Sequence, residues 1–126
     1  MNESILTSIK KMLGIADDYR VFDTDIIVLI NSAFMTLNQL NVGPKEGFSI
    51  WDYTKRWGDY LDDRLMLNAV QEYIYMKVKM VFDPPGNSYV MDAMKERCAE
   101  YEQRLVMQAE RNEDFSFVNK ENNPRL

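Results

Sequence analysis

The sequence predicts an all-α protein: a four-helix bundle with an aromatic loop or short β-hairpin between its second and third helices and an extended C-terminal tail. Three observations support this fold. Four segments repeat apolar residues at the spacing of an amphipathic helix. Glycine and proline separate these segments. The end of the chain is polar and has no helical stripe, so residues 1–110 are expected to form a helical domain and residues 111–126 a tail.

The first helix is expected between Asn2, which can cap its start, and Gly14, which can end it. Lys10 and Lys11 lie near its C-terminus, where the helix dipole favours cations. The Asp17-Asp18 pair is predicted to lie in a solvated turn and not in a metal or acid site, because no histidine or further carboxylate follows at metal-ligand spacing. The apolar face of this helix consists of Ile5, Leu6, Ile9, Met12 and Leu13.

The second helix starts at Asp23 or Asp25, and it has an unusual polar face. No charged side chain occurs from Ile26 to Pro44, and Val28 and Met35 lie seven residues apart among amides and hydroxyls. A free surface helix normally carries charge, so this face predicts contact with another chain. An exposed amide-rich face with two isolated apolar residues is the open alternative. The core stripe is Ile26, Ile30, Ala33, Leu37 and Leu40.

Residues 41–60 break helical periodicity yet contain both tryptophans of the chain. Aromatic rings need apolar cover, so this segment either closes the end of its own bundle or reaches a neighbouring subunit. A short strand or half of a hairpin is possible at residues 48–54. With Val28 and Met35, the predicted subunit-interface residues are Phe48, Trp51, Tyr53 and Trp57.

The third helix, within residues 61–85, is apolar around about half of its circumference and is therefore expected at the centre of the bundle. Asp63 can cap its start, and Asp83-Pro84-Pro85-Gly86 must end it. Two apolar stripes run along it, and it is assigned a scaffold role without chemistry. The first stripe is Leu67, Val70, Ile74, Val78 and Val81, and the second is Met66, Ala69, Tyr73, Met76 and Met80.

The fourth helix starts at Ser88, and its apolar stripe includes Cys98 as a small core residue. From Arg111 the chain turns polar, but Phe115, Phe117 and Val118 form a compact apolar cluster. This cluster predicts an extended segment that docks on another chain, by strand addition or into a groove. A loose tail with incidental apolar residues is the alternative.

Composition excludes most enzyme classes. The chain has no histidine and one cysteine, so the usual zinc sites and the His-activated nucleophiles are absent. The carboxylates Asp59, Asp62, Asp63 and Glu72 form the only acidic cluster worth considering, and cap and dipole effects explain most of it. We predict no catalysis, metal or cofactor. Without a long apolar segment we expect no membrane span and a soluble protein made in a reducing cytoplasm.

Four motifs occur in order along the chain: LNVGP (residues 40–44), EGFSIWD (46–52), DDRL (62–65) and YIYMKVKMVFDPP (73–85). With the surrounding helices, they resemble small head-tail connector, or adaptor, proteins of long-tailed bacteriophages and prophages. The resemblance extends from about Ile5 to Ala109. The lysine-bearing helix that ends in FDPP is its most distinctive part, and the segment beyond Glu110 matches only as an extension of variable sequence.

The resemblance implies a helical virion adaptor, made in the host cytoplasm and located in the neck between capsid and tail. It implies a ring of about twelve copies below the portal protein, which extends the DNA channel and binds a stopper or tail-completion protein. DNA would pass without specific binding, because the net charge of −5 disfavours phosphate. A small helical DNA-binding or regulatory phage protein is the alternative, although no helix has a dense basic face.

Overall fold

Five helices make up the protein in a computed structural model that describes the backbone of residues 2–122 and the side chains of residues 2–113. They are α1 (Ile5–Met12), α2 (Asp23–Gln39), α3 (Trp57–Tyr60), α4 (Arg64–Phe82) and α5 (Ser88–Asn122). The all-α prediction is confirmed, and the short helix α3 is an addition to it. Within residues 2–122 there is no β-strand, so the loop alternative holds between α2 and α4 and the hairpin alternative is wrong.

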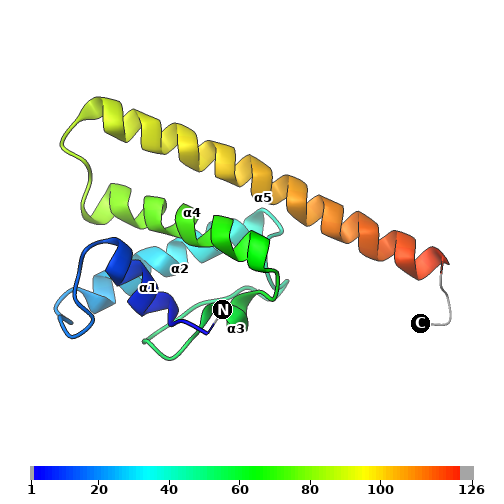
Figure 1. The fold of residues 1–126 in the computed structure, drawn as a ribbon, viewed down its shortest axis with the longest axis horizontal. Helices are drawn as coiled ribbons and strands as arrows, with labels where there is room; N and C mark the ends of the chain where they lie inside the picture. The colour runs from blue at the N-terminus through cyan, green and yellow to red at the C-terminus, as the bar shows by residue number, and fades with distance from the viewer. Residues whose placement is uncertain (1, 123–126) are drawn as a thin grey trace.

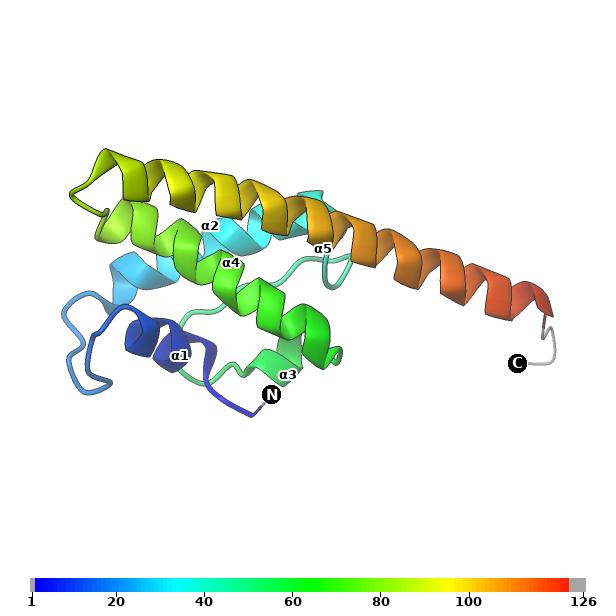
Figure 2. The ribbon, with the colours of Figure 1, turned by 45° about the horizontal axis from the view of Figure 1, so that its top comes forward.

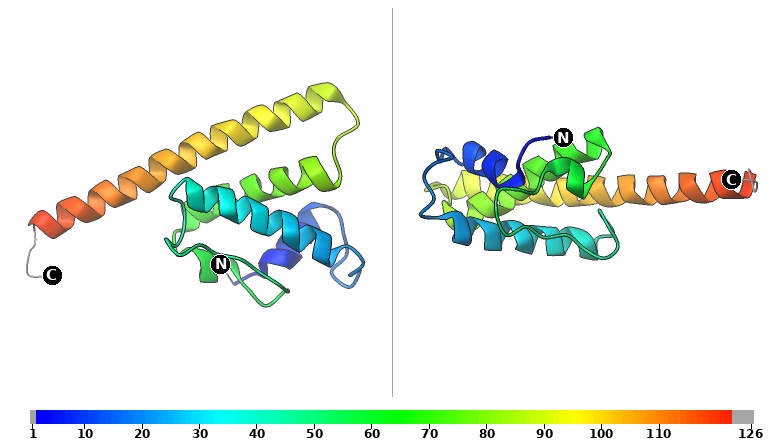
Figure 3. Two further views of the ribbon diagram at one scale, coloured as in Figure 1. Left: turned by 180° about the vertical axis from the view of Figure 1, so that it is seen from behind. Right: turned by 90° about the horizontal axis from the view of Figure 1, so that it is seen from below.

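Helix α4 is the central element, and it packs against α1, α2 and α5. Figures 1 and 2 show α5 running along α4, and the view from below in Figure 3 shows α1 and α3 on one side of the body and α2 on the other. Because α1 is short and α5 packs mainly on α4, the helices do not surround one common seam as in a regular four-helix bundle.

The predicted ends of α4 are confirmed. Asp63 accepts a hydrogen bond from the Met66 amide at 3.2 Å, and the helix stops at Asp83, directly before two prolines. Ser4 caps α1 in place of Asn2, since its hydroxyl accepts from the Thr7 amide at 3.2 Å. Gly14 follows α1 with φ of +80°, a conformation that glycine adopts without strain.

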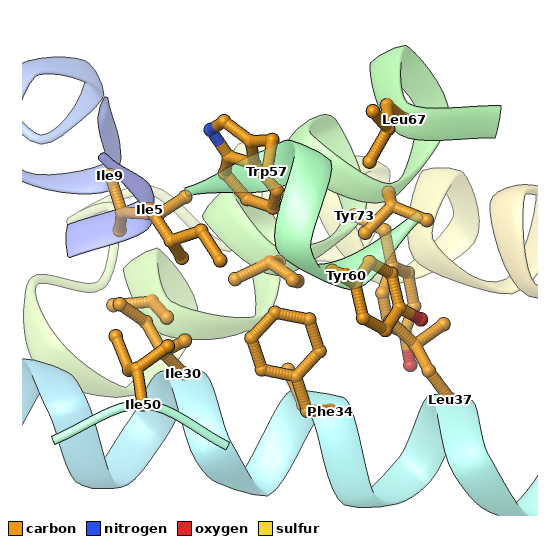
Figure 4. Packing of buried hydrophobic residues seen from close by; sticks show 14 of the residues in the cluster. Ile5, Ile9, Ile30, Phe34, Leu37, Ile50, Trp57, Tyr60, Leu67 and Tyr73 are labelled. Carbon is orange, nitrogen blue, oxygen red and sulfur yellow. The ribbon is translucent and has the colours of Figure 1, made fainter. Parts of the chain in front are cut away.

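Trp57 is a core residue and is fully buried, as Figure 4 shows among the aliphatic and aromatic side chains of α1, α2 and α4. Its indole Nε1 donates to Ser8 Oγ at 3.1 Å, and its backbone amide donates to the Glu3 carbonyl. A ring buried in its own chain has no surface left for a partner. The prediction that Trp57 lies at a subunit interface is therefore wrong for the folded chain.

Lys10 is also buried, at 1% exposure, although it lies in the last turn of α1. Its Nζ lies 2.8 Å from Asp23 Oδ1, and it donates to the backbone carbonyls of Asp17 (3.1 Å) and Tyr19 (2.8 Å). One ammonium thus holds the turn after α1 and the first residue of α2 together. A buried charge with a carboxylate and two carbonyls around it is satisfied rather than isolated.

A polar contact and a thiol lie between α4 and α5. The Tyr73 hydroxyl donates to Glu102 Oε1 at 2.6 Å, and burial together with this carboxylate raises the pKa of Tyr73, so the phenol stays protonated. Cys98 is buried as predicted, and burial raises the pKa of its thiol. The predicted core stripe of α4 is wrong at Val81, which is 66% exposed.

The predicted extended tail is wrong in its backbone, because α5 continues to Asn122. Neither glycine nor proline occurs between Ser88 and Asn122, so a helix that is already nucleated extends at little cost per residue. Near the end of the described side chains, Asn112 Nδ2 of α5 lies 3.6 Å from Met66 Sδ of α4. The side chains of Phe115, Phe117 and Val118 lie outside the described residues.

Candidate subunit-contact surface

A narrow stripe on α2 stays exposed in the folded chain. Ile26, Ile30 and Leu37 turn into the core, while Val28 is 60% and Met35 66% exposed. Ser32 and Gln39 continue the exposed stripe, so its residues alternate at spacings of three and four. This is the spacing with which a helix presents one seam to a partner. The stripe from Val28 to Gln39 carries no charge, so covering it removes no ion from water.

Two amides of the same helix have a different role, which narrows the predicted contact surface. Asn31 exchanges two hydrogen bonds with the backbone of Ile50, at 2.7 and 2.8 Å, as a neighbouring strand would. Asn38 Nδ2 donates to the carbonyls of Pro44 and Lys45 at 3.1 and 3.3 Å. The loop after α2 thus covers one flank of its own helix, so the absence of charge there has an explanation within the chain.

Replacing Asn31 with Ala is expected to loosen this loop without unfolding the protein. The change removes both hydrogen bonds to Ile50, which corresponds to a loss of about 1–2 kcal/mol in the free energy of unfolding. We expect the Ile50 amide to exchange with solvent at least about tenfold faster, measured by NMR hydrogen exchange. Ser32→Ala, on the exposed stripe nearby, is the control. Unchanged exchange at Ile50 in Asn31→Ala would contradict the anchoring role.

The four predicted aromatic contact residues divide into two groups. Phe48 is half-buried and packs on Phe34 and Tyr60, with ring centroids 5.1 and 5.2 Å apart, so it mainly belongs to the core. Trp57, as described above, is fully buried. Trp51 is 69% and Tyr53 54% exposed. These two rings remain as exposed aromatic anchors.

A contact that sequence reasoning missed joins this loop to the turn before α2. The Arg20 guanidinium lies over the ring of Tyr53, 5.4 Å from its centroid, and 3.7 Å from Asp23 Oδ2. Cation–π pairs between two loops follow from the tertiary fold, and no local pattern marks them. We define the contact surface as Val28, Ser32, Met35, Trp51 and Tyr53.

Two of the four acidic residues considered earlier, Asp59 and Asp63, have structural roles. Asp59 accepts from the Arg56 amide at 2.8 Å, and Asp63 caps α4. Among the side chains that the structure describes, no three of His, Cys, Asp or Glu gather closely enough to hold a metal ion. Over residues 2–122, no helix combines the length and apolarity needed to cross a membrane.

Comparison with known families decides the identity of the chain. The model of a family described as phage connector protein matches residues 5–112, which is most of the sequence. The chain belongs to this family. The resemblance inferred from the sequence motifs is therefore confirmed. No curated protein and no solved structure matches the chain.

Membership gives the connector a structural, non-enzymatic role in the virion, at the junction of head and tail. The family match ends at residue 112, close to Glu113, the last residue whose side chain the structure describes. Helix α5 continues beyond the matched residues to Asn122.

Proposed function

We propose that the connector assembles as a ring of about twelve copies beneath the portal, joins the capsid to the tail and extends the DNA channel. The observation that carries this proposal is the uncharged contact surface of Val28, Ser32, Met35, Trp51 and Tyr53, exposed on a chain whose core is already complete without it. Large exposed apolar side chains next to hydroxyls are typical of a surface that another protein covers.

In a ring, each copy contacts two neighbours through two different surfaces. The contact surface supplies one of them. Covering Val28, Met35 and Trp51 removes apolar area that the folded chain leaves in water, at a gain of about 25 cal/mol per Å². The absence of charge along the stripe keeps the desolvation cost low.

The charge balance fits passage of DNA without retention. The chain has 20 acidic and 15 basic side chains, and phosphate is held mainly by clustered lysine and arginine. An acidic ring repels the duplex from its wall, so the duplex slides through the channel. Specific binding would need a basic or base-reading surface.

The assembly test is native mass spectrometry and electron-microscopy class averages of the purified connector, alone and with its portal protein. We expect ring-sized oligomers in at least one of the two samples. A connector that stays monomeric in both samples and does not bind the portal protein would contradict the proposed function.

The segment after Glu113, with Phe115, Phe117 and Val118, is proposed to dock on the portal. Ending the chain at Glu113 is expected to leave thermal stability within about 1 kcal/mol of the full chain, because the buried core residues lie between Ile5 and Leu105. Affinity for immobilised portal is expected to fall at least about tenfold, measured by interferometry. Phe115→Ser with Phe117→Ser in the full-length chain should weaken binding similarly, and unchanged affinity in both variants would remove this role.

A further inference from the structure

A second apolar surface lies at one end of the molecule, outside the contact surface of Val28, Ser32, Met35, Trp51 and Tyr53. At this end α2 begins, α4 ends and α5 begins, as Figures 1 and 2 and the left view of Figure 3 show. Val21 is 71%, Val81 66% and Tyr89 85% exposed. We define the end patch by its six exposed apolar residues: Tyr19, Val21, Phe22, Val81, Tyr89 and Val90.

Aromatic contacts join part of the end patch into one surface. The rings of Tyr19 and Phe22 lie 5.8 Å apart, and Phe22 packs edge-on against Phe82 at 5.2 Å. Phe22 and Phe82 therefore tie the turn before α2 to the last turn of α4. The exposed residues around them add little to the fold, since their side chains remain largely in water. Apolar side chains gathered in this way are typical of a protein interaction site.

The position of the end patch indicates its partner. Helix α5 starts at this end and runs the length of the body, so that Asn122 lies at the opposite end (Figure 1). A connector has a neighbour on the head side and another on the tail side. Under the proposed function, the far end of α5 faces the portal, and the end patch then faces away from the head.

We infer that the end patch is the surface on which the connector binds its tail-side protein partner. This inference rests on the proposed function and adds to it the surface that meets the tail. Under the proposed function, the contact surface lies between neighbouring copies in the ring. The end patch instead forms the contact along the ring axis with the tail-side protein. The two surfaces adjoin, because Arg20, between Tyr19 and Val21 of the end patch, lies over Tyr53 of the contact surface.

The charges around the end patch define the chemistry of the partner. Asp17, Asp18 and Asp25 are exposed beside it. Arg20 and Lys79 each lie within ion-pair distance of an aspartate of their own chain, at 3.7 and 2.8 Å. Arg20 shares Asp23 with the buried Lys10, so the charges around the end patch sum to −1. The acidic residues are Asp17, Asp18, Asp23, Asp25 and Asp83, and the basic residues are Lys10, Lys11, Arg20 and Lys79. A fitting partner presents an apolar centre bordered by basic side chains, and the complementary charge accelerates association.

Continuity with the ring contact makes the binding multivalent. Neighbouring copies that meet through Tyr53 place their end patches side by side around the ring. A weak contact that repeats around a ring gains affinity from the high effective concentration of each further copy. Full rings are therefore expected to hold the tail-side partner far more tightly than single subunits do.

The test uses the phage that encodes the connector, with its connector gene removed and a variant supplied from a plasmid. Val81→Lys with Tyr89→Ser changes two exposed residues of the end patch. Leu65→Lys with Met107→Ser is the matched control, because it changes exposed residues of the same two helices outside the patch. Electron microscopy counts the DNA-filled heads that carry a tail, and mass spectrometry of purified tailless heads detects the connector.

We expect the end-patch variant to give filled heads that contain the connector and lack tails, with the tailed fraction reduced at least about tenfold relative to the control. Filled heads that contain the variant and carry tails at the control level would overturn the inference while leaving the ring intact. Heads that lack the variant connector would also overturn it, since the patch would then serve assembly on the head. Absence of wild-type connector from the heads would instead contradict the proposed function.

Folding of the variant is checked by circular dichroism and thermal melting. Both positions are exposed, and lysine is favourable in the last turn of a helix, so we expect native stability. If the double variant is unstable, Tyr89→Ser alone replaces it, because this residue is 85% exposed. For this single variant, the fraction of DNA-filled heads that carry a tail is interpreted in the same way as for the double variant.

Discussion

Replacing Lys10 with Met is expected to lower the free energy of unfolding by about 3 kcal/mol, which corresponds to a fall of about 10 °C in Tm. Met keeps most of the apolar stem but removes the ammonium, so Asp23 loses its 2.8 Å partner and two backbone carbonyls lose their donor. Asp23 keeps 17% side-chain exposure, which limits the penalty. Chemical denaturation with circular dichroism measures the change.

Lys11→Met is the control for this experiment, because Lys11 is adjacent in sequence and exposed. It is expected to change stability by less than about 0.5 kcal/mol. Combining Lys10→Met with Asp23→Asn completes a double-mutant cycle, and a coupling of at least about 1 kcal/mol is expected. Equal effects of Lys10→Met and Lys11→Met would show that the buried ion pair does not stabilise the fold.

Replacing Val28 and Met35 together with Asp is expected to abolish ring assembly while leaving the subunit folded. Both side chains are mostly in water in the single chain, at 60% and 66% exposure, so the core is unaffected. In an assembled ring, each new carboxylate would be buried without a partner, at a cost of several kcal/mol. We expect at least a hundredfold loss in association, at about 1.4 kcal/mol for each factor of ten.

Native mass spectrometry with portal present measures this loss, and circular dichroism confirms that helicity is retained. Leu65→Asp with Met107→Asp is the matched control, because it adds the same charges at exposed apolar positions on other helices. If rings close as readily with Asp at residues 28 and 35 as in the wild type, the α2 stripe is not a subunit contact.

The sequence by itself determined the presence of the four longer helices, both ends of α4 and the family. Helical spacing located α1, α2, α4 and the packed part of α5, because burial of one face is encoded by residues three and four apart. Asp63 and the prolines after Asp83 determined the ends of α4 through local chemistry that needs no distant partner. The ordered motifs that end in FDPP identified the family, which the match over residues 5–112 confirmed.

Only the tertiary structure decided which similar residues are buried. Lys10 and Lys11 both lie in the last turn of α1, and only the path of the following turn places two carbonyls and Asp23 around Lys10. Trp51 and Trp57 share one aromatic segment, yet Trp51 is 69% exposed and Trp57 fully buried. The sequence predicts Asn31 as a surface amide, whereas in the structure its side chain forms two hydrogen bonds with the backbone of Ile50. Local spacing specifies a face of a helix, whereas the element that covers this face comes from a distant part of the chain.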